Sequence, residues 1–204
     1  MHTEVVVRGK PYTFADYFRL NPDIEELLAY FGYSLEITKC QLPRTNRTLD
    51  RLEALRLRLE ESLPNVGLTS EIARREFLIA PVLAELIHYT QAKIRVEYPL
   101  NISEQLQGTL DYFIRSKQNF LVVEAKNEDL QRGFTQLAVE LIALSQWREE
   151  EQEEIFGAVS IGRVWQFGVL DCRAKRITQD TDLYQVPNDL EDLLRILVAI
   201  LSGE

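Results

Sequence analysis

Two short runs, Gly108-Thr109-Leu110-Asp111-Tyr112-Phe113 and Leu121-Val122-Val123-Glu124-Ala125-Lys126, decide how this 204-residue chain is expected to fold. The second run is apolar up to its acid, which is typical of a central strand covered on both faces. Side chains two residues apart share one face of a strand, so Glu124 and Lys126 project together while Ala125 points into the core. If the first run pairs with the second as an antiparallel hairpin, Asp111 comes near Glu124.

Two neighbouring carboxylates are the feature of this hairpin that points to chemistry. Side by side they repel, and a divalent cation between them removes that cost, because Mg²⁺ takes hard oxygen ligands and retains waters. Lys126 would then lie beside the metal, where it can orient an attacking water, help to deprotonate it, or stabilise charge on a phosphate. The main-chain carbonyl of Ala125 is a further candidate ligand. Metal and ammonium together supply what phosphodiester hydrolysis requires.

The flanking sequence predicts an α/β fold built around this hairpin. Leucine spacing predicts an amphipathic helix over 49–63 that ends at Pro64, and Thr69 or Ser70 begins a long helix to Tyr89 that Pro81 should kink. Shorter helices are expected at 12–18 and 22–31, a buried-stripe helix at 130–147 and a closing helix at 190–201. Further strands are expected at 94–98, 155–161, 164–170, 176–177 and 183–186.

We interpret the chain as one domain, because it contains no internal repeat, low-complexity tract or Gly/Ser linker. Residues 1–66 are expected to form an N-terminal helical extension, 67–187 a core with a mixed central sheet, and 188–204 a C-terminal helix. No apolar run approaches the roughly 18–20 residues that a membrane span needs. The N-terminus lacks the basic and apolar regions of a signal peptide, so a cytoplasmic location without a membrane partner is expected.

The net charge of −9 argues against the simplest model of nucleic-acid binding, in which a basic surface grips phosphates. The charge is unevenly spread, with a glutamate-rich run at 149–154 and an arginine-rich stretch at 44–58. A bound cation would also offset the carboxylates of a metal site. The arginines form either a solvated helix face or an approach surface for DNA; they are Arg44, Arg47, Arg51, Arg56 and Arg58.

The order of motifs resembles the αβββαβ core of restriction-endonuclease-like PD-(D/E)xK nucleases over about residues 68–170. A helix and a strand precede the Gly-x-x-Asp strand, which is followed by the Val-Val-Glu-Ala-Lys strand and a glutamine-bearing helix. In this resemblance Asp111 matches the motif's aspartate, Glu124 its second acid and Lys126 its lysine. Leu110 stands where the motif has proline, as in many members of the superfamily.

The resemblance implies further site residues on the two flanking helices. Members often carry a glutamate on the first core helix that joins the metal shell, and the segment around Glu71 resembles the nuclease segment of type I restriction subunits. Glu71 is preferred over Glu76 for this role. Gln136 matches a glutamine that contacts a phosphate or water on the helix after the lysine strand, and Glu140 lies one turn further on.

The leading hypothesis is therefore a Mg²⁺- or Mn²⁺-dependent endonuclease acting on DNA, with Asp111, Glu124, Lys126 and Gln136 as catalytic residues. Cutting both strands normally needs two sites, so a homodimer is expected. The alternative is a catalytically silent nuclease-fold module that dimerises or binds a partner, in which these residues are ordinary strand-end and helix-surface groups. A third possibility is action on RNA or a nucleotide; the absence of a Gly-rich phosphate loop argues against an NTPase.

Overall fold

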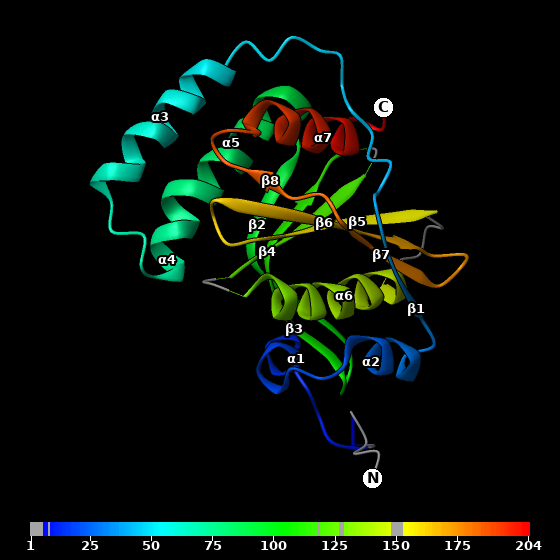
Figure 1. Cartoon of the computed structure of the whole chain (residues 1–204). Helices are drawn as coiled ribbons and strands as arrows, with labels where there is room; N and C mark the ends of the chain where they lie inside the picture. The colour runs from blue at the N-terminus through cyan, green and yellow to red at the C-terminus, as the bar shows by residue number, and fades with distance from the viewer. Residues whose placement is uncertain (1–5, 8, 118, 127–128, 148–152) are drawn as a thin grey trace.

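A computed structural model of the whole chain describes residues 6–7, 9–117, 119–126, 129–147 and 153–204. It is mixed α/β, with an eight-stranded sheet in the order β1-β7-β6-β5-β4-β3-β2 and β8 paired to β6 (Figure 1). The strands are β1 (Ser34–Thr38), β2 (Lys93–Ser103), β3 (Leu106–Arg115), β4 (Phe120–Ala125), β5 (Glu154–Ser160), β6 (Val164–Asp171), β7 (Arg176–Asp180) and β8 (Tyr184–Gln185). Most of the glutamate-rich run at 149–154 lies outside the described residues.

The helices cover both faces of this sheet. They are α1 (Phe14–Leu20), α2 (Ile24–Tyr30), α3 (Leu52–Asn65), α4 (Glu71–Arg74), the π-helical turn η1 (Arg75–Ile79), α5 (Ala80–Thr90), α6 (Leu130–Trp147) and α7 (Leu190–Ser202). One face carries α6, with α1 and α2 packed outside it, and the other carries α3, α5 and α7 (Figure 1). Every residue of α6 from Gly133 to Leu144 is buried, because this helix is enclosed between the sheet and the two N-terminal helices.

The sheet mixes the two strand directions in a way that places a helix crossover next to the hairpin. β2, β3 and β4 pair antiparallel, and β4 then pairs parallel with β5 through the crossover helix α6. A parallel connection of this kind requires a long crossover, which α6 supplies. The C-terminal ends of β4 and β5 therefore lie side by side, beneath the same helix.

Residues 1–66 were expected to be a helical extension, and this was incomplete. β1 joins the sheet edge by pairing parallel with β7, and α1 contacts α6 extensively. Leu55 and Leu59 of α3 are fully buried in the core beside α5 and α7. Residues 33–38 do alternate apolar and polar side chains, a strand signal that our sequence predictions missed, although only one residue of β1 is half-buried in the structure.

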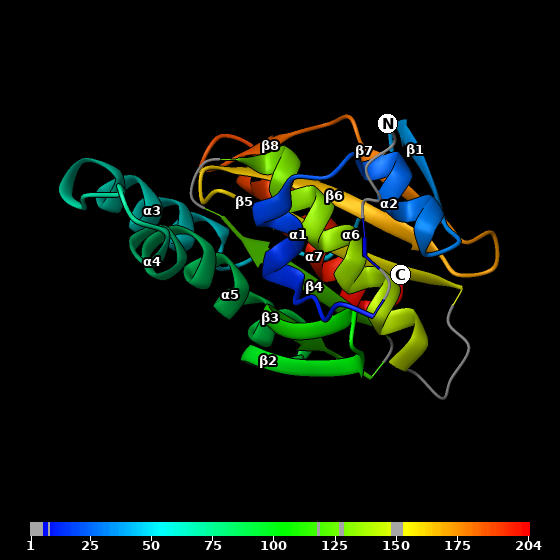
Figure 2. The ribbon, with the colours of Figure 1, turned by 90° about the horizontal axis from the view of Figure 1, so that it is seen from below.

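The long helix predicted from Thr69 or Ser70 to Tyr89 is present as α4, η1 and α5, and it contains a π-helical turn just before Pro81. Ala80 N–H donates to the carbonyl of Arg75, five residues back, so one extra residue is accommodated within the helix. α3 also runs one residue past Pro64, where a stop was expected. Figure 2 shows α3 and α4 projecting beyond the sheet as an arm. None of the helices in the described ranges combines the length and apolar character that crossing a bilayer requires.

Candidate functional site

The site is built on the β3–β4 hairpin, whose register brings Asp111 to the end of β4. Tyr112 lies opposite Val123 in the antiparallel pair, so Asp111 follows at the level of Glu124. One carboxylate oxygen of Asp111 accepts a hydrogen bond of 2.9 Å from the backbone N–H of Ala125. The hairpin expected from the sequence is present, and it holds the aspartate against the chain segment that carries the glutamate and the lysine.

Glu124 and Lys126 project from the same face of β4, toward α6. The Glu124 side chain is 1% exposed and forms an ion pair with the ammonium of Lys126, which is itself 12% exposed. The backbone of Lys126 is fixed by its N–H, which donates to the carbonyl of Ser160 at the end of β5 at 2.8 Å. The ring of Phe18 on α1 lies 5.0 Å from the ammonium nitrogen and partly covers it in a cation–π contact.

The helix α6 contributes two polar side chains to this otherwise apolar interface. The side-chain amide of Gln136 donates to Glu124 at 2.6 Å and to Glu140 at 2.8 Å, and so links the two carboxyl groups. Gly133 allows this close approach: a Cβ there would lie 2.6 Å from a Val159 methyl and 3.0 Å from Lys126 Cγ. Gln136 was predicted from the sequence, and the more deeply buried Glu140 was a secondary candidate.

Burial dominates the electrostatics of the carboxyl pair. It raises the pKa of Glu124 well above its usual value, with the charges of Glu140 and Asp111 adding to the rise and Lys126 opposing it. It also raises the pKa of Glu140 to about 8, against the hydrogen bond from Gln136 and the charge of Lys126. Because the two groups interact strongly, they titrate as a pair, and the pair retains at least one proton at neutral pH.

Burial acts on Lys126 in the opposite direction, and the neighbouring acids outweigh it. Desolvation alone would lower the pKa of the ammonium, but Glu124, Asp111 and Glu140 together raise it above the usual lysine value. Lys126 therefore remains protonated at neutral pH. It supplies a fixed positive charge at the end of β4.

Three buried oxygens of the cluster have no hydrogen-bond donor among the described residues. They belong to Glu124, Gln136 and Glu140, one from each side chain. A buried acceptor left without a donor costs about 1–3 kcal/mol, so such groups normally meet a proton, an ordered water or an ion. Oxygen donors of this kind suit Mg²⁺ or Mn²⁺. Within the described ranges, however, no three Asp, Glu, His or Cys side chains form a metal-binding group, so amide, main-chain or water oxygens must complete any coordination shell.

An arginine that the sequence did not single out lies on the other side of Asp111. A guanidinium nitrogen of Arg75, in the π-helical turn, lies 3.6 Å from Asp111 and 3.6 Å from Glu97. The guanidinium also stacks over the ring of Tyr112 at 5.3 Å. The hydrophobic periodicity of the sequence does not distinguish Arg75 from its neighbour Arg74. Which of the two faces the hairpin depends on the extra residue in the π turn, and the sequence pattern does not reveal that turn.

The two helix glutamates considered from the sequence are not joined to this cluster. Among the described residues, no hydrogen bond or ion pair links Glu71 or Glu76 to Asp111, Glu124 or Lys126, and Glu76 is exposed. The proposed metal role of Glu71 therefore stays a prediction, as does that of the Ala125 carbonyl.

Most of the arginine-rich stretch 44–58 is engaged within the protein. Arg44 pairs with Asp192, Arg47 with Glu204, and Arg56 donates to the carbonyl of Pro187 at 2.8 Å. These contacts tie the stretch to α7 and the segment before it. The expected solvated helix face is wrong for Arg44 and Arg47, which precede α3 and form ion pairs, and a role of the stretch in binding DNA stays a prediction.

No family model, curated protein or solved structure matches the chain. The site consists of an aspartate, a buried pair of carboxyl groups bridged by an amide, and a protonated lysine, at the adjoining ends of two strands. Such a cluster can hold a cation and present a positive charge beside it.

Proposed function

We propose that the chain is a metal-dependent nuclease that hydrolyses phosphodiester bonds in nucleic acid, with DNA as the substrate. The observation that carries the proposal is the convergence of Asp111, Glu124 and Lys126 at one end of β4, above three buried oxygens that lack donors. The order α5-β2-β3-β4-α6-β5 also agrees with the αβββαβ order of restriction-endonuclease-like cores.

A Mg²⁺ or Mn²⁺ ion fits this donor set. Asp111 and Glu124 would hold it, with oxygens of Gln136 or Glu140 and the Ala125 carbonyl as the remaining protein donors. When bound, such an ion activates water as a nucleophile and polarises the phosphoryl oxygen. It would also replace the proton that the buried carboxyl pair retains, which removes the repulsion between the two acids.

Each protein group has a role that follows from its environment. Lys126, which stays protonated, binds a non-bridging phosphate oxygen and stabilises the negative charge that develops there. It acts through its positive charge and does not serve as a base. Gln136 orients Glu124 through its 2.6 Å hydrogen bond. The backbone N–H of Ala125 and the guanidinium of Arg75 orient the two oxygens of Asp111.

The test is cleavage of plasmid DNA by purified protein with Mg²⁺ or Mn²⁺. We expect Asp111→Asn and Lys126→Met to lose activity by at least about a hundredfold, the scale on which removing one charge-stabilising group slows such reactions. Exposed Glu60→Gln on α3 is the matched control and should keep full activity. Activity that persists unchanged in the two site variants comes from a contaminating nuclease and refutes the proposal.

One observation favours the alternative of a catalytically silent module. The ammonium of Lys126 already forms an ion pair with Glu124, and the ring of Phe18 partly covers the ammonium. The charge of Glu124 is therefore balanced without a bound ion. Calorimetric titration with Mg²⁺ separates the two functions, since a working site takes up the cation and a closed one does not. A homodimer, proposed for double-strand cutting, is tested by the sedimentation of the protein alone and with DNA.

A further inference from the structure

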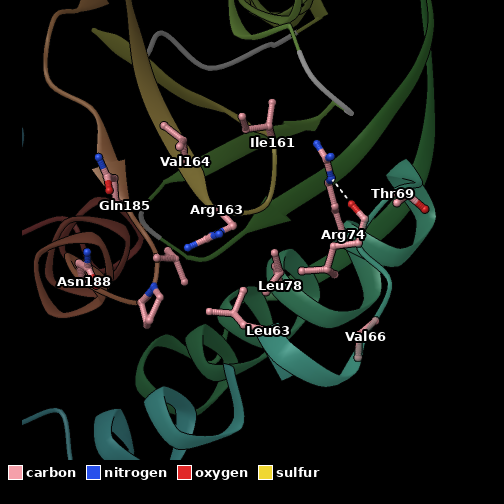
Figure 3. Close-up of a pocket in the computed structure, with 13 residues that line it drawn as sticks. Leu63, Val66, Thr69, Arg74, Leu78, Ile161, Arg163, Val164, Gln185 and Asn188 are labelled. Atoms are coloured by element: carbon pink, nitrogen blue, oxygen red, sulfur yellow. Dashed lines mark hydrogen bonds between the residues drawn. The ribbon is translucent and has the colours of Figure 1, made fainter. Parts of the chain in front are cut away.

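A groove of about 690 Å³ lies between the helical arm and the end of the sheet (Figure 3). Arg74 at the end of α4 and Leu78 in η1 line it on one side, and Arg163, in the turn between β5 and β6, lines it from the sheet. Gln185 and Asn188 lie on the far side, toward which the Arg163 side chain extends. The groove is therefore lined by both apolar and polar side chains.

The charge of the groove is opposite to that of the chain. Two arginines and no acid stand among its described lining residues, although the whole chain carries a net charge of −9. Within the described part of the chain, Arg163 is exposed and its guanidinium has neither an ion pair nor a hydrogen bond. Arg74 donates once, to the carbonyl of Leu68 at 2.8 Å, and has no carboxylate partner there (Figure 3). Both guanidinium groups thus keep donors available for an anion.

Two lining residues of the groove are chain neighbours of residues that contact the candidate site. Arg74 immediately precedes Arg75, which contacts Asp111, and Ile161 follows Ser160, whose carbonyl accepts the hydrogen bond from the backbone of Lys126. Gly162 allows the turn that carries Ile161 and Arg163 to pack closely on the helix: a Cβ there would lie 2.9 Å from Leu78.

We infer that this groove binds the sugar-phosphate backbone of the nucleic acid, with Arg74 and Arg163 contacting phosphates next to the one that is cleaved. This inference rests on the proposed nuclease function and assigns the path of its substrate. The planar guanidinium matches two phosphate oxygens at once, and the amides of Gln185 and Asn188 provide further donors. Contacts to the backbone position the strand without reading its sequence.

The experiment measures binding without cleavage, by fluorescence anisotropy of labelled single-stranded and duplex DNA with Ca²⁺ in place of Mg²⁺. We expect Arg163→Ala and Arg74→Ala each to weaken binding about tenfold, which is about 1.4 kcal/mol. Each should also reduce the slope of log affinity against log salt by about one phosphate contact. Exposed Arg115→Ala, at the opposite end of β3, is the matched control and should bind as the unsubstituted protein does.

Because Arg74 also donates a hydrogen bond to Leu68, thermal unfolding of the Arg74 variant is measured alongside its binding. Arg163→Ala decides the result, because the Arg163 side chain has no hydrogen bond or ion pair among the described residues. The inference is overturned if Arg163→Ala binds DNA as tightly as the control, or if polyglutamate displaces DNA as well as unlabelled DNA does. Arginine-dependent binding with no cleavage by the unsubstituted protein would support the groove and refute the nuclease. Cleavage with unchanged binding in Arg163→Ala would do the reverse.

Discussion

Glu140→Gln is the substitution whose effect is most fully determined by the structure. Glu140 is fully buried on α6, accepts a hydrogen bond from Gln136, and lies beside the second buried acid, Glu124. Glutamine has the same shape but cannot ionise. The substitution therefore removes one titrating group from the cluster and leaves its packing in place.

The sign of the effect follows from which state holds the proton. Burial raises the pKa of Glu140 from 4.5 to about 8, so between these values the folded protein keeps a proton that the unfolded chain has released. Metal-free protein must then lose stability as the pH rises through this window. Because one pKa unit corresponds to about 1.4 kcal/mol, the full loss attributable to this group is at most about 5 kcal/mol.

The assay is urea unfolding in the presence of a chelator, at several pH values from about 5 to about 8. The free energy of unfolding of the original protein should fall across this range, and that of Glu140→Gln should fall less, because only Glu124 of the pair then keeps a raised pKa. Added Mg²⁺ should restore stability in the original protein, and more at the upper end of the range, because the proton has to leave before the ion binds.

Exposed Glu60→Gln serves as the control for a change of one charge and should follow the original protein. Parallel pH dependences for the original protein and Glu140→Gln would refute the reasoning, because Glu140 would then hold no proton that the unfolded chain lacks. Equal Mg²⁺ stabilisation at both ends of the range would refute the second step, in which the ion replaces that proton.

Three further substitutions test the packing that places the site. Gly133→Ala puts a methyl group 2.6 Å from Val159 and 3.0 Å from Lys126 Cγ. It should lower the free energy of unfolding, measured in urea, by about 1–3 kcal/mol and should also reduce cleavage activity. Unchanged activity would mean that α6 does not position Lys126. Leu55→Ala, at a fully buried position in α3, should cost about 2–5 kcal/mol, whereas a melting temperature equal to that of the original protein would show that residues 1–66 are detachable. Tyr17→Phe removes the 2.8 Å hydrogen bond to the carbonyl of Gln105 and should cost about 1 kcal/mol, measured in the same way; no change would show that this bond does not help to hold α1 on the β2–β3 hairpin.

The sequence by itself determined the hairpin and the crossover helix. The apolar run 120–123 indicates a central strand, and the two-residue repeat of a strand places Glu124 and Lys126 on one face. The apolar spacing from Leu130 to Leu144 predicts α6, although the structure buries every residue of this helix from Gly133 to Leu144. These are local properties of a strand and a helix, which is why the position of Lys126 beside Glu124 follows without coordinates.

Only the tertiary structure decided what meets this hairpin. β1 has a largely exposed pattern and is a strand because β7 offers it hydrogen-bond partners far along the chain. Arg75 faces Asp111 because a π turn shifts the helix by one residue, and Glu140 joins Glu124 because Gly133 lets α6 approach the strands. Such contacts depend on the distance and the relative rotation of two packed elements. Both are set by the packing of all the side chains between the elements, and the hydrophobic periodicity of a single segment does not contain this information.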